Sequence, residues 1–319
     1  MESKTAIARM RAAHRFEDLL PNSTDPNKSR LRGKLVTLLN AEGEVLPAAD
    51  KPLGKLWRLV NSPSSSIDDC EEIIRLDPAL TSRIFRVANS AAYGARATDI
   101  AEAIRFIGFK VVREMVFNAG VLSQFSSLVV PQEWEIYWLR NIFTARLADR
   151  IGSSFFSTDG SEYLAGLIHD IGWLFLATHF PEEFAQIMAS EKPTCDAEKD
   201  ILPFGHANIA AAVAARSALP LKAIDAIAYH HKQALTTTST LVAPNQNPLF
   251  LAIILNVCDK IADGCQLDLF GKEPVTLEDV RETPEVVWLK NYGKKIDLEA
   301  MASEELVKAQ EIYTVFFTD

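Results

Sequence analysis

The chain has 319 residues, a formal net charge of −9 and 48% hydrophobic residues. This length and apolar content allow one large or two ordinary domains with a well-packed core. The acidic balance argues against nucleic-acid binding as the main function, because neutralising phosphates requires clustered Lys and Arg, although it leaves room for a local basic patch.

The first third of the sequence predicts a series of short helices. Residues 1–45 form an N-terminal helical extension, with helices expected over 5–20 and 31–39 and a turn over 21–27. A further helix is expected over 55–60. Ser66 followed by Asp69 is a capping-box arrangement, and Asp77-Pro78 ends one helix and begins the next.

The next two helices are expected to meet at Gly108. Thr98 or Asp99 caps the first, and Gly108 suits its C-terminal end. Periodicity places Ile73, Ile84 and Ile104 on buried faces.

The remainder of the chain also follows the 3.6-residue period of helices. Helices are expected over 109–119, 133–151, 161–179, 181–190, 195–218, 220–231 and 249–262. The β-branched stretch 236–240 is polar and is expected to be a loop. The tail, 266–319, contains one amphipathic helix that should dock on the body. The fold class predicted is therefore all-α.

The cysteine spacing and the hydropathy of the chain indicate in which cellular compartment the protein is expected. The four cysteines show no C-x-x-C spacing, so neither a zinc ribbon nor a redox motif has support; they are Cys70, Cys195, Cys258 and Cys265. The longest apolar run, residues 249–255, is far short of the roughly 20 residues of a membrane-spanning helix. The N-terminus has no apolar signal-peptide core. We expect a cytoplasmic protein with no membrane association.

The most informative stretch is residues 166–172, GLIHDIG, in which His169 and Asp170 stand between apolar residues. Imidazole and carboxylate groups are both metal donors, and neither is easily buried unless paired or coordinated. More candidate donors follow later in the chain. The full set of candidate metal ligands is His169, Asp170, His206, His230, His231 and Asp259.

Five of the six candidates also have a purely structural interpretation, and His206, near an expected helix start, is weaker evidence. His169 and Asp170 could be a hydrogen-bonded pair that joins helices. His230 and His231 could interact with a helix C-terminus, where the dipole favours a cation, with one of them facing solvent. Asp259 could form a solvated pair with the adjacent Lys260.

Residues elsewhere have weaker claims. His14 and His179 are treated as ordinary. The helices around Gly108 could also be taken for a DNA-binding helix-turn-helix, but two helices around a glycine are common in helical proteins.

Several blocks of the sequence closely resemble the HDOD family, the bacterial HD-related output domains. They are LDPALTSRI at 76–84, ANSAAYG at 88–94, AIRFIG at 103–108, GLIHDIG at 166–172 and AYHH at 228–231. The resemblance implies an HDOD domain over 46–240, built of two packed helical subdomains of which the second is HD-domain-like. Residues 241–319 would then complete or dock on the HD-like part.

The sequence departs from the catalytic relatives of this family at two positions. Alignment places Arg140 where those enzymes have the first metal-binding His, and a guanidinium cannot ligate a metal. Trp173 stands where many of them have a Lys after the HD-I-G motif. The Arg140 side chain is expected to point into the cluster and replace the cation.

Two functions of different classes follow from the resemblance. The favoured one is a non-catalytic module of bacterial signal transduction that acts through signalling proteins, with no cofactor and no nucleic acid expected; a homodimer is compatible with it. The alternative is a metal-dependent phosphohydrolase acting on a nucleotide or phosphodiester, with Mn, Fe, Mg or Zn held by His169, Asp170 and Asp259. In that case His206, His230 and His231 would extend the site or bind a second ion.

Overall fold

The computed structural model describes residues 16–41, 66–90, 93, 97–126, 128–131, 134, 136–192, 194–216, 219–231, 249–270, 276–291 and 296–317. Every regular element within these ranges is helical, which confirms the predicted all-α class. The helix expected over 55–60 and the loop expected over 236–240 lie outside the described residues, as does most of the helix expected over 5–20. Of that last helix only the 3₁₀ turn η1 (Phe16–Leu19) is described.

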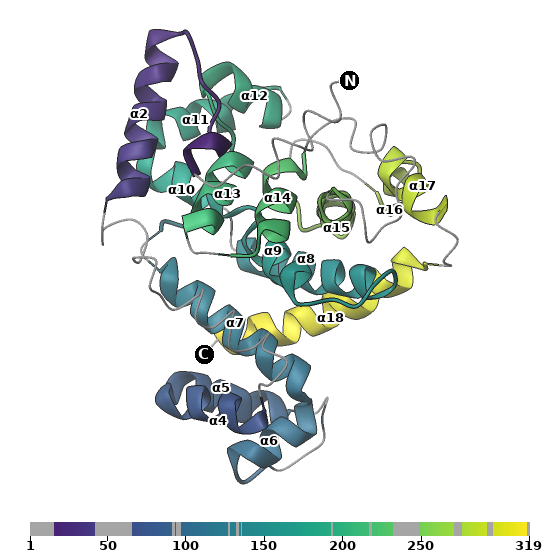
Figure 1. The fold of residues 1–319 in the computed structure, drawn as a ribbon. Helices are drawn as coiled ribbons and strands as arrows, with labels where there is room; N and C mark the ends of the chain where they lie inside the picture. Colours follow the sequence, from purple (N-terminus) through teal and green to yellow (C-terminus); the bar gives the residue numbers. More distant parts are fainter. Residues whose placement is uncertain are drawn as a thin grey trace.

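The helices form two subdomains (Figure 1). The smaller one, at the bottom of the view, contains α4 (Ile67–Leu76), α5 (Pro78–Ala88), α6 (Ile100–Ile107) and the start of α7 (Phe109–Gln124), which runs up toward the larger body. The body contains α8 (Tyr137–Ser153), α9 (Ser161–Ile168), α10 (Ile171–His179), α11 (Pro181–Ala189), α12 (Thr194–Ile201), α13 (His206–Arg216), α14 (Leu221–Tyr229) and α15 (Phe250–Gly264). Around it lie α2 (Pro26–Asn40), α16 (Leu277–Arg281), α17 (Pro284–Asn291) and α18 (Leu298–Phe317).

The helix boundaries of the smaller subdomain follow the capping signals. Ser66 and Asp69 form a reciprocal capping box at α4, and the Asp77 side chain caps α5, with Pro78 at its first position. Asp99 caps α6. Gly108 joins α6 to α7 with a φ of 82°, a conformation that glycine adopts without strain.

Four predicted boundaries were wrong. The helix expected over 161–179 is broken at His169-Asp170 into α9 and α10, and the one expected over 195–218 is broken into α12 and α13. The helix expected over 31–39 begins earlier, at Pro26, because Asp25 caps it and Pro26 suits its first turn. The tail contains α16, α17 and α18 rather than one helix.

Helix α8 is the centre of the core, and it packs against α9, α15 and α18. Nearly all its residues are buried, including polar ones such as Arg140, Asn141 and Arg146. Buried polar groups need partners, so α8 must be surrounded by complementary charges. Ile84 and Ile104 are also buried, as predicted, whereas the side chain of Ile73 lies outside the described residues.

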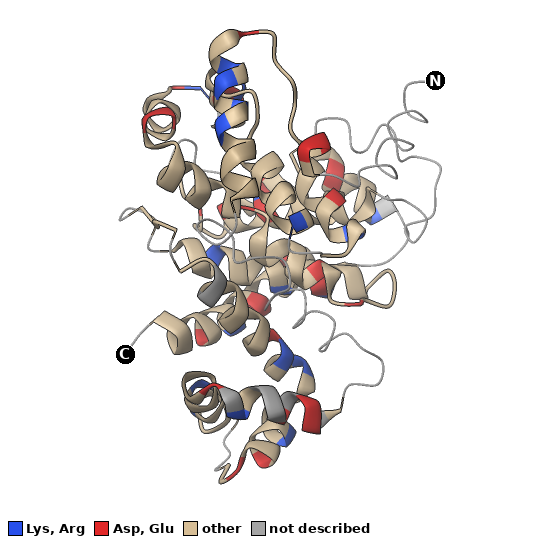
Figure 2. Ribbon diagram, turned by 60° about the vertical axis from the view of Figure 1, so that its left-hand side comes forward, with Lys and Arg blue, Asp and Glu red and all other residues tan. Residues whose placement is uncertain are grey.

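Charged residues are spread over both subdomains, with Lys and Arg interspersed with Asp and Glu along the ribbon (Figure 2). Among the described residues, no helix is both long and apolar enough to cross a membrane.

Candidate functional site

Two glycines allow the helices of the candidate site to approach closely. A Cβ atom on Gly166 of α9 would lie 2.6 Å from the Cα of Ala145 in α8. A Cβ atom on Gly172 of α10 would lie 2.0 Å from the carbonyl oxygen of His206, at the start of α13. These contacts place the His169-Asp170 junction between α8 and α13.

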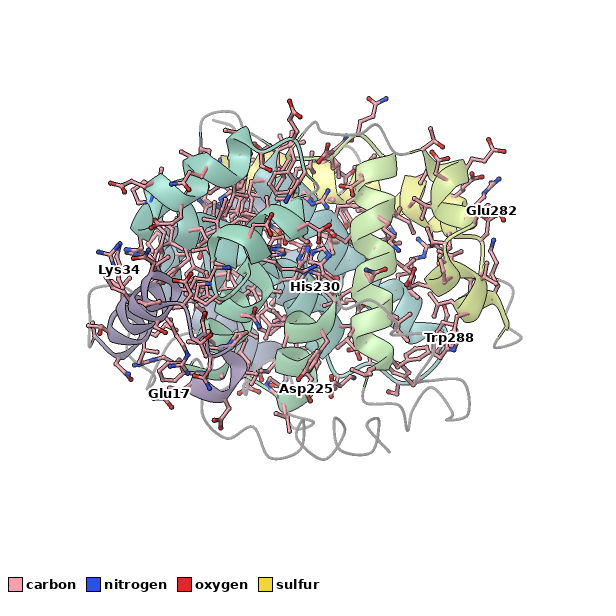
Figure 3. All side chains as sticks on the ribbon, turned by 90° about the horizontal axis from the view of Figure 1, so that it is seen from above. Glu17, Lys34, Asp225, His230, Glu282 and Trp288 are labelled. Carbon is pink, nitrogen blue, oxygen red and sulfur yellow. The ribbon has the colours of Figure 1, made fainter. Side chains whose placement is uncertain are left out.

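The site lies in the interior of the body, where Figure 3 shows His230 among the helices, whereas Asp225 and Trp288 lie nearer the edge. Five segments contribute to it: α8, the α9–α10 junction, the start of α13, the end of α14, and α15. All the candidate residues are buried except His231, whose side chain is 29% exposed. The candidate site has two halves, and Asp170 belongs to both.

In the first half, the Arg140 guanidinium lies among three carboxylates. It forms an ion pair with Asp259 Oδ1, donates from Nη1 to Asp263 Oδ1 at 2.6 Å, and places Nε 3.7 Å from Asp170 Oδ2. Nη1 also donates to the carbonyl oxygen of Leu267 at 2.9 Å. Burial alone would lower the pKa of Arg140, but the three aspartates outweigh it and raise that pKa. Arg140 is therefore a fixed positive charge.

His169 is the second cation of this half. Its Nδ1 donates to the carbonyl oxygen of Gly166 at 2.8 Å, and its Nε2 lies 3.3 Å from both Asp170 Oδ2 and Asp259 Oδ1. Burial lowers the pKa of His169, but the two carboxylates more than compensate and raise it to about 10. The imidazole is therefore protonated at neutral pH.

The acidic groups of this half differ in their charge. Burial opposes ionisation of Asp170 and Asp259, but His169 lowers the pKa of Asp170 and Arg140 lowers that of Asp259. Burial instead raises the pKa of Asp263 to about 7, despite Arg140. Two ionised carboxylates thus face two resident cations.

The second half contains three histidines around the other oxygen of Asp170. His206 Nε2 lies 3.5 Å from Asp170 Oδ1, and its Nδ1 donates to Glu198 Oε2 at 2.9 Å. His230 Nδ1 donates to the carbonyl oxygen of Ile227 at 2.7 Å. His231 Nε2 lies 3.8 Å from Asp259 Oδ2.

The histidines of the second half differ in protonation. Burial and neighbouring imidazoles lower the pKa of His230 well below its usual value, and burial with His206 lowers that of His231 to about 4. Burial would lower the pKa of His206 too, but Glu198 raises it. At neutral pH the neutral imidazoles of His230 and His231 are able to donate a lone pair.

The two halves differ in how well they fit a metal ion. Donor atoms of His169, Asp170 and Asp259 lie within 4.8 Å of one another, but the Arg140 guanidinium contacts the same carboxylates and His169 Nε2 faces them as a donor, so this set does not fit a divalent ion. Donor atoms of Asp170, His206, His230 and His231 also lie within 4.8 Å of one another. In that second set, the chemistry of the donors fits a metal.

The structure brings together all six candidate ligands, with Arg140 pointing into the same cluster. Asp259 does not form the solvated pair with Lys260 that was considered, because Lys260 pairs with Glu285 instead. Trp173 is buried and stacks on the His206 ring, with 4.5 Å between centroids.

The sequence did not predict two acidic residues that contact the site: Asp263, which pairs with Arg140, and Glu198, which accepts from His206. Asp263 follows Asp259 by four residues, and this spacing puts both on one helix face. Glu198 had no such signal, since a loop separates it from His206.

The buried His169-Asp170 pair lies at the centre of an all-helical body. Residues 46–233 match the HDOD domain. This is more than half of the chain, which therefore belongs to the HDOD domain family.

Solved structures share this fold. An HDOD domain protein of unknown function from Geobacter sulfurreducens matches with a TM-score of 0.68 and 21% identity, over 90% of this chain and 98% of that one. A protein of Shewanella amazonensis provisionally assigned as a phosphohydrolase matches with a TM-score of 0.64 and 21% identity, over 89% and 97% of the two chains. A protein of Marinobacter aquaeolei provisionally assigned to signal transduction matches with a TM-score of 0.64 and 19% identity, over 91% and 67%.

A curated relative extends the comparison to sequence. An uncharacterized protein of Treponema pallidum is 27% identical over 199 residues, which is 58% of this chain. The match spans only 37% of that relative's length.

Proposed function

We propose that this HDOD chain is a non-catalytic regulatory module of bacterial signal transduction that acts through partner proteins. Family membership supports a regulatory role, and the fold is shared with a Marinobacter aquaeolei protein provisionally assigned to signal transduction. The observation that carries the proposal is the position of Arg140.

Arg140 supplies the positive charge that a catalytic metal would otherwise bring. Its guanidinium pairs with Asp259 and Asp263 and lies 3.7 Å from Asp170 Oδ2, and His169 adds a second cation to the same carboxylates. At separations of about 4 Å like charges repel strongly in a protein interior. A divalent ion bound by His169, Asp170 and Asp259 would have to displace one cation and deprotonate the other.

A metal-dependent phosphohydrolase is the second candidate, and one observation favours it. Asp170, His206, His230 and His231 can converge on an ion, which could activate water for attack on a phosphoester. We rank this candidate lower because Arg140 removes a ligand from the neighbouring position. Trp173 also removes a cation that could contact a phosphate.

The proposal is tested by assaying turnover in the presence of metal. Purified protein with added Mn²⁺, Fe²⁺ or Zn²⁺ should show no hydrolysis of bis(4-nitrophenyl) phosphate or of nucleotides above the level of His169→Ala and Asp170→Ala. Arg140→His restores the missing ligand and should measurably raise metal affinity. Wild-type hydrolysis that either alanine variant abolishes would make the phosphohydrolase the better description.

A further inference from the structure

A cavity of about 400 Å³ lies outside the candidate site, at the joint between the two subdomains. This volume is within the range of small-molecule sites, about 300–1,000 Å³. Helix α18 lies between α8 and the smaller subdomain (Figure 1), and the cavity lies where α18 and α8 meet α7 and the end of α5. We call it the joint cavity, and its lining includes Tyr93, Lys110, Glu114, Arg146, Lys308 and Glu311.

Part of the lining is apolar. Val87 of α5 and Ile312 of α18 are buried, and Val111 of α7 is half-buried. Tyr93 adds an aromatic ring, and it belongs to the ANSAAYG block, which contributes no residue to the candidate site. Such a surface suits the hydrocarbon body of a small molecule.

The cations of the joint cavity are already neutralised. Among the described residues four cations line it, and each forms an ion pair with a carboxylate; they are Lys110, Arg146, Arg150 and Lys308. Glu305 alone pairs with three of them. Burial opposes ionisation of Glu305, but Arg146 outweighs it and lowers the pKa of Glu305. An anionic ligand would have to displace carboxylates that are already in place.

Glu311 of α18 differs from the other acidic groups of the cavity. It is half-buried, and it forms no ion pair with any residue that the structure describes. Burial raises the pKa of Tyr93, and Glu311 raises it further, so the two side chains lie close enough to interact. A carboxylate accepts strong hydrogen bonds from an ammonium group, and the face of an aromatic ring attracts the same charge.

We infer that the joint cavity binds a small organic amine, whose ammonium group lies between Glu311 and Tyr93. Its hydrocarbon body lies along Val87, Val111 and Ile312. The inference goes beyond the proposed function and does not depend on it, because none of these residues belongs to the candidate site. Of the three classes of ligand, cation, neutral molecule and anion, only a cation supplies the charge that Glu311 lacks.

A bound amine would contact both sides of the joint. Tyr93 and Val111 come from the segment that begins with the smaller subdomain, whereas Glu311 and Ile312 come from α18, beyond residues 46–233. A ligand that binds this arrangement in preference to others increases its population. The concentration of the amine would therefore set how the two subdomains are held together, which gives a regulatory module a small-molecule input.

The inference is tested by isothermal titration calorimetry of the full chain with three matched probes. Tryptamine, tryptophol and indole-3-propionate share an indole and an ethyl chain and end in an ammonium, a hydroxyl and a carboxylate. Tryptamine should bind with one molecule per chain, and the other two should bind at least about ten-fold more weakly, because hydrogen bonds to charged groups are the stronger ones. Amide hydrogen exchange should slow in α7 and α18 when tryptamine is bound.

Matched variants locate the amine. Glu311→Gln keeps the size of the side chain but removes its charge, and it should weaken tryptamine binding by about ten-fold or more. Glu299→Gln changes a residue of the same helix that lies outside the cavity and pairs with Arg281, so it should bind tryptamine as wild type does. Val111→Phe narrows the cavity and should also weaken binding while the helical circular-dichroism spectrum is retained.

Three results would overturn the inference: no binding of tryptamine by the wild type, binding of tryptophol or indole-3-propionate as tight as that of tryptamine, or unchanged tryptamine binding in Glu311→Gln. Failure of the proposed function is distinguishable from these. Metal-dependent hydrolysis would refute the non-catalytic module and leave the amine site standing, whereas absence of amine binding would refute only the amine site.

Discussion

At the scale of single residues, the buried charges of this body differ in how they are compensated. Arg140 is surrounded by carboxylates that keep it ionised. Asp225, on α14, is also buried, and burial raises its pKa to about 7. Asp225 is therefore a group whose ionisation opposes folding.

Asp225→Asn should remove a pH-dependent loss of stability. The ordinary pKa of this group is 3.8, so between about pH 4 and 7 the folded state binds more protons than the unfolded state. The contribution of Asp225 to the free energy of unfolding therefore falls as the pH rises from about 4 to 7, and it stays low at higher pH. We expect the variant to be more stable than wild type at pH 8 by on the order of 1 kcal/mol or more, and equal to it near pH 4.

Urea denaturation at a series of pH values measures this difference. Asp18→Asn, at an exposed position, is the control for loss of a surface carboxylate and should change the free energy of unfolding by no more than about 0.5 kcal/mol. A difference for Asp225→Asn that is flat from pH 4 to 8 would show that its carboxylate is solvated in the folded state.

At the scale of helices, close contacts rather than local propensity determine how the site is assembled. Gly166 and Gly172 flank the His-Asp pair, and each leaves no room for a Cβ atom. Gly33, in α2, has no atom within 4 Å of such a position. The chain thus contains a glycine needed for packing and a matched glycine that is not.

Gly166→Ala should destabilise the protein, and Gly33→Ala should not. The added methyl at Gly166 would lie 2.6 Å from the Cα of Ala145, and overpacking of this kind costs about 1–3 kcal/mol. At Gly33 the same change improves helix propensity and should stabilise by about 0.5–1 kcal/mol. Chemical denaturation of both variants tests the pair, and equal effects would contradict the packing argument.

The helices whose ends were predicted correctly are those that begin or end at a capping residue or a glycine. Ser66, Asp77, Asp99 and Gly108 act through hydrogen bonds to their neighbours or through their own φ, so their effect is visible in a short stretch. The break between α12 and α13 also had such a signal, since Pro203 and Gly205 disfavour a continuous helix. That signal was overlooked.

The break at His169-Asp170 had no local signal, because no Pro or capping pattern marks it. Asp170 leaves the helical conformation with φ −99° and ψ 5°, and α10 then turns so that Gly172 meets His206. The six candidate ligands could be named from residue type and family resemblance. Their division into two halves could not, because it depends on which oxygen of Asp170 faces which neighbour.

At the scale of the whole molecule, α8 connects the site to the joint between the subdomains. Arg140 lies toward the N-terminal end of α8 and Arg146 lies six residues further on, 7% exposed. Arg146 forms an ion pair with Glu114 of α7 and donates from Nε to Glu305 of α18 at 2.8 Å. The buried Arg146 guanidinium thus joins α8 to α7, which leads into the smaller subdomain, and to α18. Helix α18 lies beyond residues 46–233, which match the HDOD domain.

Arg146→Leu should destabilise this joint strongly. Removing one partner of a buried ion pair costs about 3–5 kcal/mol, because the remaining charge stays buried; here Glu114 would lose its ion pair with Arg146, whereas Glu305 would keep its pairs with Arg150 and Lys308. Burial already raises the pKa of Glu114, so the cost should be smaller at pH 5, where the Glu114 carboxyl can take up a proton, than at pH 8. Amide hydrogen exchange should accelerate in α18 before it accelerates in α9.

Arg150→Leu is the matched control, since Arg150 also pairs with Glu304 and Glu305 but is 29% exposed. An exposed pair contributes about 0–1 kcal/mol, so this variant should lose little stability. Combining Arg146→Leu with Glu114→Gln should recover part of the loss, because the pair is coupled. Equal losses for Arg146→Leu and Arg150→Leu in urea denaturation would show that α18 is held by its apolar face and not by the buried guanidinium.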